Sequence, residues 1–120
     1  MVRISDSEWK IMSLLWDDEP RTMTQITKAL FEETGWSKHT VITLLKRLEA
    51  KGFLHHEDGG RAKLFYSDVS RNEAVMEEKK NFLNKVFKGQ AGLLVANMIE
   101  QGDFSSADIE MLKDLLNKGS

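Results

Sequence analysis

The 120-residue sequence contains no cysteine, and this absence excludes both disulfide bonds and thiolate metal sites. It also lacks long apolar runs, so no segment reaches the length of a membrane span. The N-terminal residues MVRISDSEW have no apolar core of the kind found in signal peptides. We therefore expect a cytoplasmic protein with no membrane partner.

Patterns that carry catalysis are missing as well. The sequence has no nucleophile elbow, no phosphate-cradling glycine loop and no metal-ligand spacing. The paired acids Glu77 and Glu78 fall on the exterior of an expected helix, without general acid-base geometry. His55 and His56 are neighbours in an expected strand, so they point to opposite faces and are poorly placed to share one ion. These features predict a protein that is not an enzyme, with no cofactor and no metal site.

Capping signals mark the first two helices. Ser5 with Glu8, and Thr22 with Gln25, each have the spacing of a capping box. The segment 17–21, which includes the only proline, ends the first helix, and Gly35 ends the second. The expected inner stripes are Trp9, Met12, Leu15 and Trp16 in the first helix, and Met23, Ile26, Ala29 and Leu30 in the second. The tryptophans are interpreted as packing anchors.

A third helix, capped by Ser37 and ending near Gly52, has two distinct faces. One face is an apolar stripe formed by Val41, Leu44, Leu45 and Leu48. The other repeats the same spacing with His39, Ile42, Thr43 and Lys46. That second set suits base edges and phosphates, and it contains no carboxylate that would repel DNA. About four residues separate helices two and three, a length typical of a helix-turn-helix.

A basic hairpin follows the third helix. The alternation predicts strands at 53–56 and 63–67 joined across 57–62. The net charge is −2, yet residues 38–63 are locally basic, with Lys38, Lys46, Arg47, Lys51, Arg61 and Lys63 against Glu49, Glu57 and Asp58. Taken in isolation, an ordinary solvated surface is the lesser alternative for Lys46 and Arg47. Together the helix and hairpin predict a mainly α winged helix-turn-helix with a small β-hairpin wing, in a domain spanning residues 1–70.

Residues 71–120 have a different character. They show helical patterns over 71–88, 91–101 and 106–118, punctuated by Gly89, Gly92 and Gly102. Three helices this short bury little surface among themselves, so their apolar residues require a partner, for which a second copy of the chain is the simplest choice. We therefore interpret 71–120 as a helical dimerisation domain. The candidate dimerisation residues are Leu94, Met98, Ile109, Leu112, Leu115 and Leu116.

Four segments together resemble the penicillinase-repressor family of bacterial transcription regulators. They are ISDSEWKIMSLLW, GWSKHTVITLLKRLEAKGFL, LFYS, and NFLNKVFKG with LVANMIEQGDFSSADIEMLKDLLNK. The resemblance covers essentially the whole chain. It implies a homodimeric repressor, connected with antibiotic resistance, that binds double-stranded operator DNA at palindromic sites. Base contacts are implied for the positions of His39, Thr40, Ile42 and Thr43, and phosphate contacts for the wing.

The full set of candidate DNA-binding residues is Ser37, Lys38, His39, Thr40, Ile42, Thr43, Lys46, Arg47, Arg61 and Lys63. A winged-helix module that binds protein, without sequence-specific DNA binding, is the alternative hypothesis. Steep salt dependence of binding would favour DNA.

The resemblance also concerns regulation. Copper-responsive members carry a cysteine-rich tail, and the absence of cysteine excludes copper sensing by that route. β-Lactam-responsive members are inactivated by cleavage after an asparagine that precedes phenylalanine, and the matching bond here is Asn97–Met98. The resemblance thus implies a signal-activated protease as a further partner, with Asn97 and Met98 as the candidate cleavage site.

Overall fold

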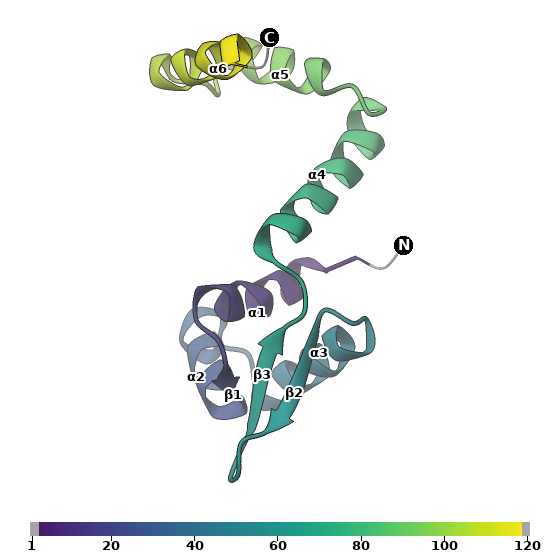
Figure 1. The fold of residues 1–120 in the computed structure, drawn as a ribbon, viewed down its shortest axis with the longest axis vertical. Helices are drawn as coiled ribbons and strands as arrows, with labels where there is room; N and C mark the ends of the chain where they lie inside the picture. Colours follow the sequence, from purple (N-terminus) through teal and green to yellow (C-terminus); the bar gives the residue numbers. More distant parts are fainter. Residues whose placement is uncertain (1–2, 119–120) are drawn as a thin grey trace. The chain divides into compact units, whose positions relative to one another are not determined.

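Nine helices and strands make up the computed structural model, which describes residues 3–118 without the side chains of Leu116 and Lys118 (Figure 1). In chain order they are α1 (Asp6–Asp17), β1 (Arg21–Thr22), α2 (Met23–Thr34), α3 (Lys38–Ala50), β2 (Leu54–Asp58), β3 (Lys63–Ser67), α4 (Arg71–Phe87), α5 (Ala91–Glu100) and α6 (Ser106–Lys118). Within these residues, no helix combines the length and apolar character needed to cross a membrane.

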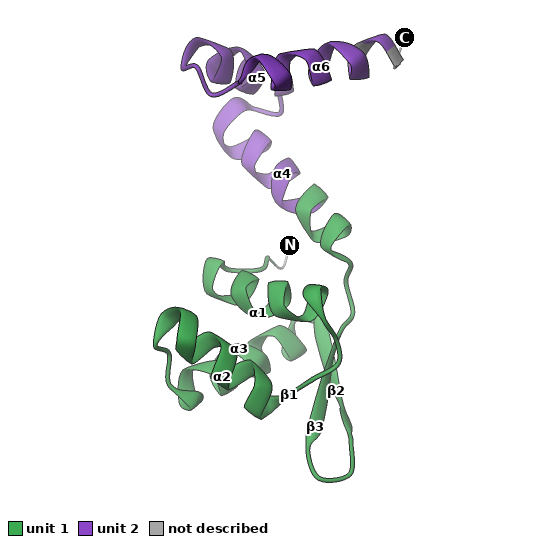
Figure 2. Cartoon of the chain, turned by 90° about the vertical axis from the view of Figure 1, so that its left-hand side faces the viewer, with its two compact units in different colours: residues 1–76 green, residues 77–120 purple. Residues whose placement is uncertain are grey.

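Two compact units divide the chain, residues 1–76 and residues 77–120, and the division falls within α4 (Figure 2). Unit 1 holds α1, α2, α3 and the sheet, and unit 2 holds most of α4 together with α5 and α6.

The predicted caps are present at the start of α1 and α2. The Ser5 side chain accepts a hydrogen bond from the Glu8 amide while Glu8 accepts one from the Ser5 amide, and Thr22 and Gln25 make the same pair of bonds. These bonds satisfy amide groups that have no partner within the helix itself. α2 ends at Gly35, whose φ of 76° is a left-handed conformation that glycine adopts without strain.

The sheet has three antiparallel strands in the order β1-β3-β2. The wing strand predicted at 53–56 is displaced, because Phe53 still donates its amide to the Leu48 carbonyl at the end of α3 and pairing begins at Leu54. Pairing then continues to Asp58, which lies opposite Lys63, so the first strand is longer than predicted. The second strand, 63–67, is confirmed.

The sequence prediction missed β1 altogether. Arg21 lies opposite Phe65 and Thr22 opposite Leu64, so this two-residue strand covers the free edge of β3. A strand of two residues has no alternating pattern, and only its pairing partner defines it.

The core of unit 1 lies between the three helices and the sheet. The predicted stripe of α3 is confirmed, because all four of its apolar residues are 5% exposed or less. In α1, Met12 and Leu15 are buried as predicted, but Trp9 and Trp16 are only partly buried and Ile11 is fully buried instead. The two indoles meet edge to face at 5.3 Å between ring centroids. The cluster comprises Ile11, Met12, Leu15, Ile26, Leu30, Val41, Leu44, Leu45, Leu48, Leu54 and Phe65.

Candidate nucleic-acid interface

The turn between α2 and α3 sets the position of the candidate recognition helix. The Thr34 hydroxyl donates to the Leu30 carbonyl at 2.7 Å and accepts from the Trp36 amide at 3.1 Å. Ser37 then accepts from the Thr40 amide at 3.2 Å and begins α3. Short polar side chains at these positions hydrogen-bond to nearby backbone, which is why they favour helix ends over helix interiors.

The face of α3 opposite the core carries the predicted contact residues. Ser37, Lys38, His39, Thr40, Lys46 and Arg47 are exposed, whereas Ile42 and Thr43 are half-buried. The Thr43 hydroxyl donates to the His39 carbonyl at 3.0 Å, one helical turn back. The hydroxyl hydrogen of Thr43 is therefore used within the helix. Its oxygen lone pairs and its methyl group remain available to contact another molecule.

A groove of about 310 Å³ runs along one flank of this face. It brings residues of α3 together with Ser7 from α1 and Trp36 from the turn. The α3 residues in the groove are His39, Thr40, Thr43, Leu44 and Arg47, so four of the ten predicted DNA-binding residues line one continuous surface.

The wing carries the other two predicted contact residues. Arg61 lies in the turn between β2 and β3 and Lys63 begins β3, and both side chains are exposed. Gly59 closes the turn with a hydrogen bond from its amide to the Ala62 carbonyl at 2.8 Å. A Cβ at Gly59 would lie 2.7 Å from Leu64 and 2.9 Å from the Ala62 oxygen, so any larger residue would displace the turn.

The ion pairs of unit 1 separate its cations into two groups. Lys10 pairs with Glu33 at 3.0 Å, Lys51 with Glu8 at 2.6 Å and Arg71 with Asp17 at 2.7 Å. In contrast, the cations on α3 and the wing make no ion pair with any carboxylate among residues 3–118; they are Lys38, Lys46, Arg47, Arg61 and Lys63. Arg21 on β1 and Lys28 on α2 also make no ion pair among these residues, so most, but not all, of the unpaired positive charge of unit 1 lies on the predicted interface.

Lys51 does not belong to the basic surface that the sequence indicated, because its charge is paired with Glu8. Its amine binds the Glu8 carboxylate and also donates to the Arg3 carbonyl at 2.9 Å. Glu8 is fully buried, a position that its charge did not suggest. Burial raises the pKa of Glu8, but hydrogen bonds from Lys51 and Ser5 outweigh it and leave the pKa below its usual value. Lys51 therefore stabilises the start of α1 against the end of α3.

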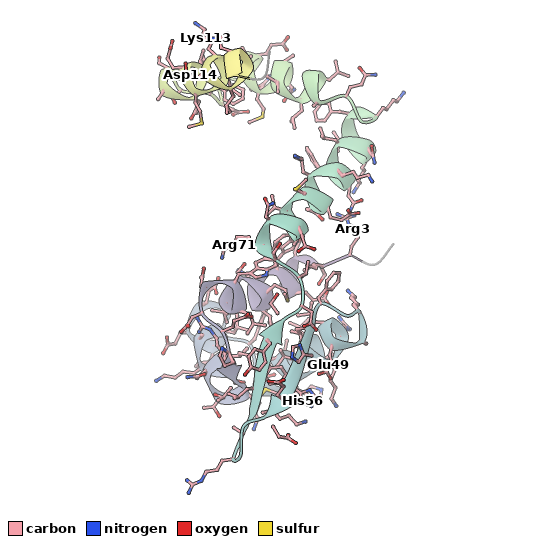
Figure 3. All side chains as sticks on the ribbon, in the orientation of Figure 1. Arg3, Glu49, His56, Arg71, Lys113 and Asp114 are labelled. Atoms are coloured by element: carbon pink, nitrogen blue, oxygen red, sulfur yellow. The ribbon has the colours of Figure 1, made fainter. Side chains whose placement is uncertain are left out.

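The two wing histidines have separate partners. His55 Nδ1 lies 2.6 Å from an Asp68 oxygen and its ring stacks on Tyr66, while His56 hydrogen-bonds to Glu49 at the end of α3 (Figure 3). Among residues 3–118, no group of three or more His, Asp or Glu side chains could hold a metal ion. The His56–Glu49 contact links β2 to α3.

In unit 2, the predicted dimerisation residues lie on α5 and α6. Ile109 is 38% exposed and Leu115 is 57% exposed, whereas Leu94, Met98 and Leu112 are partly buried. The Leu116 side chain lies outside the described residues. Asn97 and Met98 lie within α5, and their carbonyls accept hydrogen bonds from the Gln101 and Asp103 amides.

The penicillinase repressor family profile matches residues 4–118. The chain belongs to this family. The methicillin resistance regulatory protein MecI of Mammaliicoccus sciuri is 35% identical over 115 residues, which cover 96% of this chain and 94% of that protein. The penicillinase repressor of Bacillus licheniformis is 28% identical over 116 residues, covering 97% and 91% of the two chains. The resemblance found in the sequence is confirmed.

Solved structures confirm the fold class. The solution structure of the DNA-binding domain of the repressor BlaI is 29% identical, with a TM-score of 0.54, and covers 61% of this chain and 93% of that domain. The oxidised form of MarR from E. coli has a TM-score of 0.52 at 16% identity, covering 96% of this chain and 74% of that one. The second likeness concerns the fold alone.

Proposed function

We propose that this protein is a transcriptional repressor that binds operator DNA as a homodimer. The observation that carries the proposal is the distribution of cations in unit 1, where most of those that lack a carboxylate partner among the described residues lie on α3 and the wing. Phosphates release counterions when such cations neutralise them, and this release supplies much of the binding free energy. The family and the printed names of its relatives, a resistance regulator and a penicillinase repressor, support the same function.

Within the proposed complex, α3 enters the major groove. His39 and Thr40 are exposed near its beginning, where recognition helices contact base edges. Thr43 presents acceptor lone pairs and a methyl group, and Ile42 is suited to a thymine methyl. Lys38, Lys46, Arg47 and the wing cations Arg61 and Lys63 hold the flanking phosphates.

Dimerisation completes the proposal. A homodimer through α5 and α6 would present two copies of α3, and a two-fold axis between them matches a palindromic operator.

Cleavage of Asn97–Met98 by a signal-activated protease would separate α6 from the DNA-binding unit and so weaken the doubled contact. Because both residues lie within a helix, cleavage requires local opening of α5. Mass spectrometry of the protein from cells exposed to a β-lactam would identify the cut bond, and an intact chain during induction would reject this switch.

Selection of bound genomic fragments by the full-length protein would first define the operator. Fluorescence anisotropy can then compare the operator with a random duplex over a range of salt concentrations. Replacing His39 by alanine should cost about 1–3 kcal/mol on the operator and little on random DNA, because base contacts carry the specificity.

Replacing Arg61 and Lys63 together should weaken binding to both duplexes and reduce the salt slope by about one to two units. Lys10→Ala is the matched control, since Lys10 is already paired with Glu33. Binding that does not depend on salt would reject the proposal and favour a protein-interaction module.

A further inference from the structure

A pocket with two lysines lies beside the candidate interface, between α2 and the start of α3. Thr24, Thr27, Lys28 and Phe31 follow one another at helical spacing on a single face of α2. Together with Lys38 from α3 they line a pocket of about 360 Å³. The opposite face of α2 carries Ile26 and Leu30, both fully buried in the core. The pocket therefore lies on the outward side of the helix-turn-helix.

The charged residues that line this pocket are both lysines. Neither Lys28 nor Lys38 makes an ion pair within the part of the chain that the structure describes, and both are exposed. The nearest acids along α2 are Glu32, which pairs with neither lysine, and Glu33, which is occupied by Lys10. The amines of these two lysines are therefore available to bind an anion of another molecule.

An exposed aromatic ring lies beside these two amines. Phe31 is 62% exposed, the highest value among the exposed large hydrophobic side chains that the structure describes. Thr27 also lines this pocket, and its hydroxyl oxygen is buried with no hydrogen-bond partner within residues 3–118. Amines beside an apolar ring and threonines match a chain of alternating phosphates and deoxyriboses.

We propose that this pocket binds the phosphodiester backbone of operator DNA next to the half-site that α3 contacts. The inference rests on the proposed function, and it adds residues that the sequence interpretation did not assign: Lys28 and Phe31, with Thr24 at the start of α2. Lys38 belongs to both surfaces, so the pocket continues the α3 interface across to α2. In helix-turn-helix proteins the first helix of the motif crosses the DNA backbone, which is the position this assignment gives to α2. Lys28 neutralises one phosphate, and Phe31 packs against the adjoining deoxyribose.

The test compares three single variants of the full-length protein, Lys28→Ala, Phe31→Ala and Lys10→Ala, on the selected operator and on a random duplex. All three side chains are exposed, so the fold should be retained. Lys28→Ala should weaken binding to both duplexes and reduce the salt slope by about one unit, because one phosphate contact is lost. Phe31→Ala should weaken binding about three- to tenfold with an unchanged slope, because it removes contact area and no charge. Lys10→Ala should match the wild type.

Phosphate ethylation interference locates the contact. Ethylation of one phosphate flanking the half-site should impair binding of the wild type and should have no further effect on Lys28→Ala. A salt slope for Lys28→Ala equal to that of Lys10→Ala, with an unchanged interference pattern, overturns the inference and leaves the pocket as a surface for another partner. If the wild type itself shows no salt-dependent binding to either duplex, the proposed function fails first.

Discussion

The two units of this chain handle apolar side chains in opposite ways. Residues 1–76 bury a cluster of aliphatic and aromatic residues, many of them with no exposed surface at all. In residues 77–120, none of the described side chains is buried, and Leu93, Ile99, Met111 and Leu115 are each more than half exposed. Unit 1 therefore has its own hydrophobic core, whereas the described apolar side chains of unit 2 remain wholly or partly exposed.

The difference follows from size and topology. In unit 1, a three-stranded sheet and three helices enclose a common interior, so each apolar stripe has a facing surface. Unit 2 has short helices and no sheet within its described residues, and exposed apolar area of this extent costs about 25 cal/mol per Å² until it is covered. A second copy of the chain would cover it. Stability in unit 1 is therefore expected to be intrinsic, and stability in unit 2 to depend on concentration.

The largest expected effect is on dimerisation, when the apolar surface of unit 2 is disrupted. Replacing Leu112 by glutamate removes apolar contact in both copies of a symmetric dimer, about 3–6 kcal/mol in total. Analytical ultracentrifugation should show monomers, while the circular dichroism of unit 1 is retained. Lys113→Gln is the control, since Lys113 is 65% exposed and only weakly paired with Glu110. A wild type that sediments as a monomer at micromolar concentration would contradict the dimer.

A smaller effect is expected from breaking the core of unit 1. Leu48 is fully buried, so Leu48→Ala should reduce the free energy of unfolding by about 2–5 kcal/mol. All three tryptophans lie in unit 1, so their fluorescence during urea unfolding follows that unit. Leu115→Ala, at an exposed site of unit 2, should leave this transition unchanged. Equal shifts for the two variants would mean that the units share one cooperative transition.

The smallest of the three effects concerns the buried ion pair that only unit 1 contains among the described residues. The folded pKa of Glu8 is lowered, so its stabilisation is present above the unfolded pKa and is lost as the pH falls through the folded pKa. Glu8→Gln should cost about 1–3 kcal/mol at neutral pH and flatten the decline of stability in acid. Urea unfolding between neutral and acid pH measures both.

Glu33→Gln is the matched control for this experiment, because it breaks the exposed Lys10–Glu33 pair, which contributes about 1 kcal/mol or less. If Glu8→Gln and the wild type lose stability over the same pH range, the ion pair is not the source of the acid sensitivity.

Local signals in the sequence identified most of the secondary structure of unit 1. The capping boxes of Ser5 and Thr22 and the end of α2 at Gly35 depend on contacts within a few residues, and all three were predicted. The four apolar positions of α3 were also predicted, because they follow the period of the helix. The exposed polar face of α3 was predicted as well, because an amphipathic helix that buries its apolar face leaves the opposite face in solvent. Their roles in DNA binding stay predictions.

Other features depend on partners distant in the chain, and the sequence did not indicate them. β1 exists only because Arg21 and Thr22 lie against β3, and Lys51 is withdrawn from the basic surface by a carboxylate 43 positions earlier. The sequence assigned no role to Lys28, and only the folded structure places it in one pocket with Lys38.

By itself, the sequence determined which segments form helices, where each begins, which face of α3 is apolar and to which family the chain belongs. Only the tertiary structure decided which charges are neutralised. The period of a helix is set by backbone geometry that every residue shares, so it is visible in the order of residues. Whether a lysine pairs with a carboxylate depends on how separate elements pack, because salt screens the attraction between exposed charges beyond about 10 Å. Lys51 was therefore misassigned to the basic surface, and Lys28 was recognised only beside Lys38.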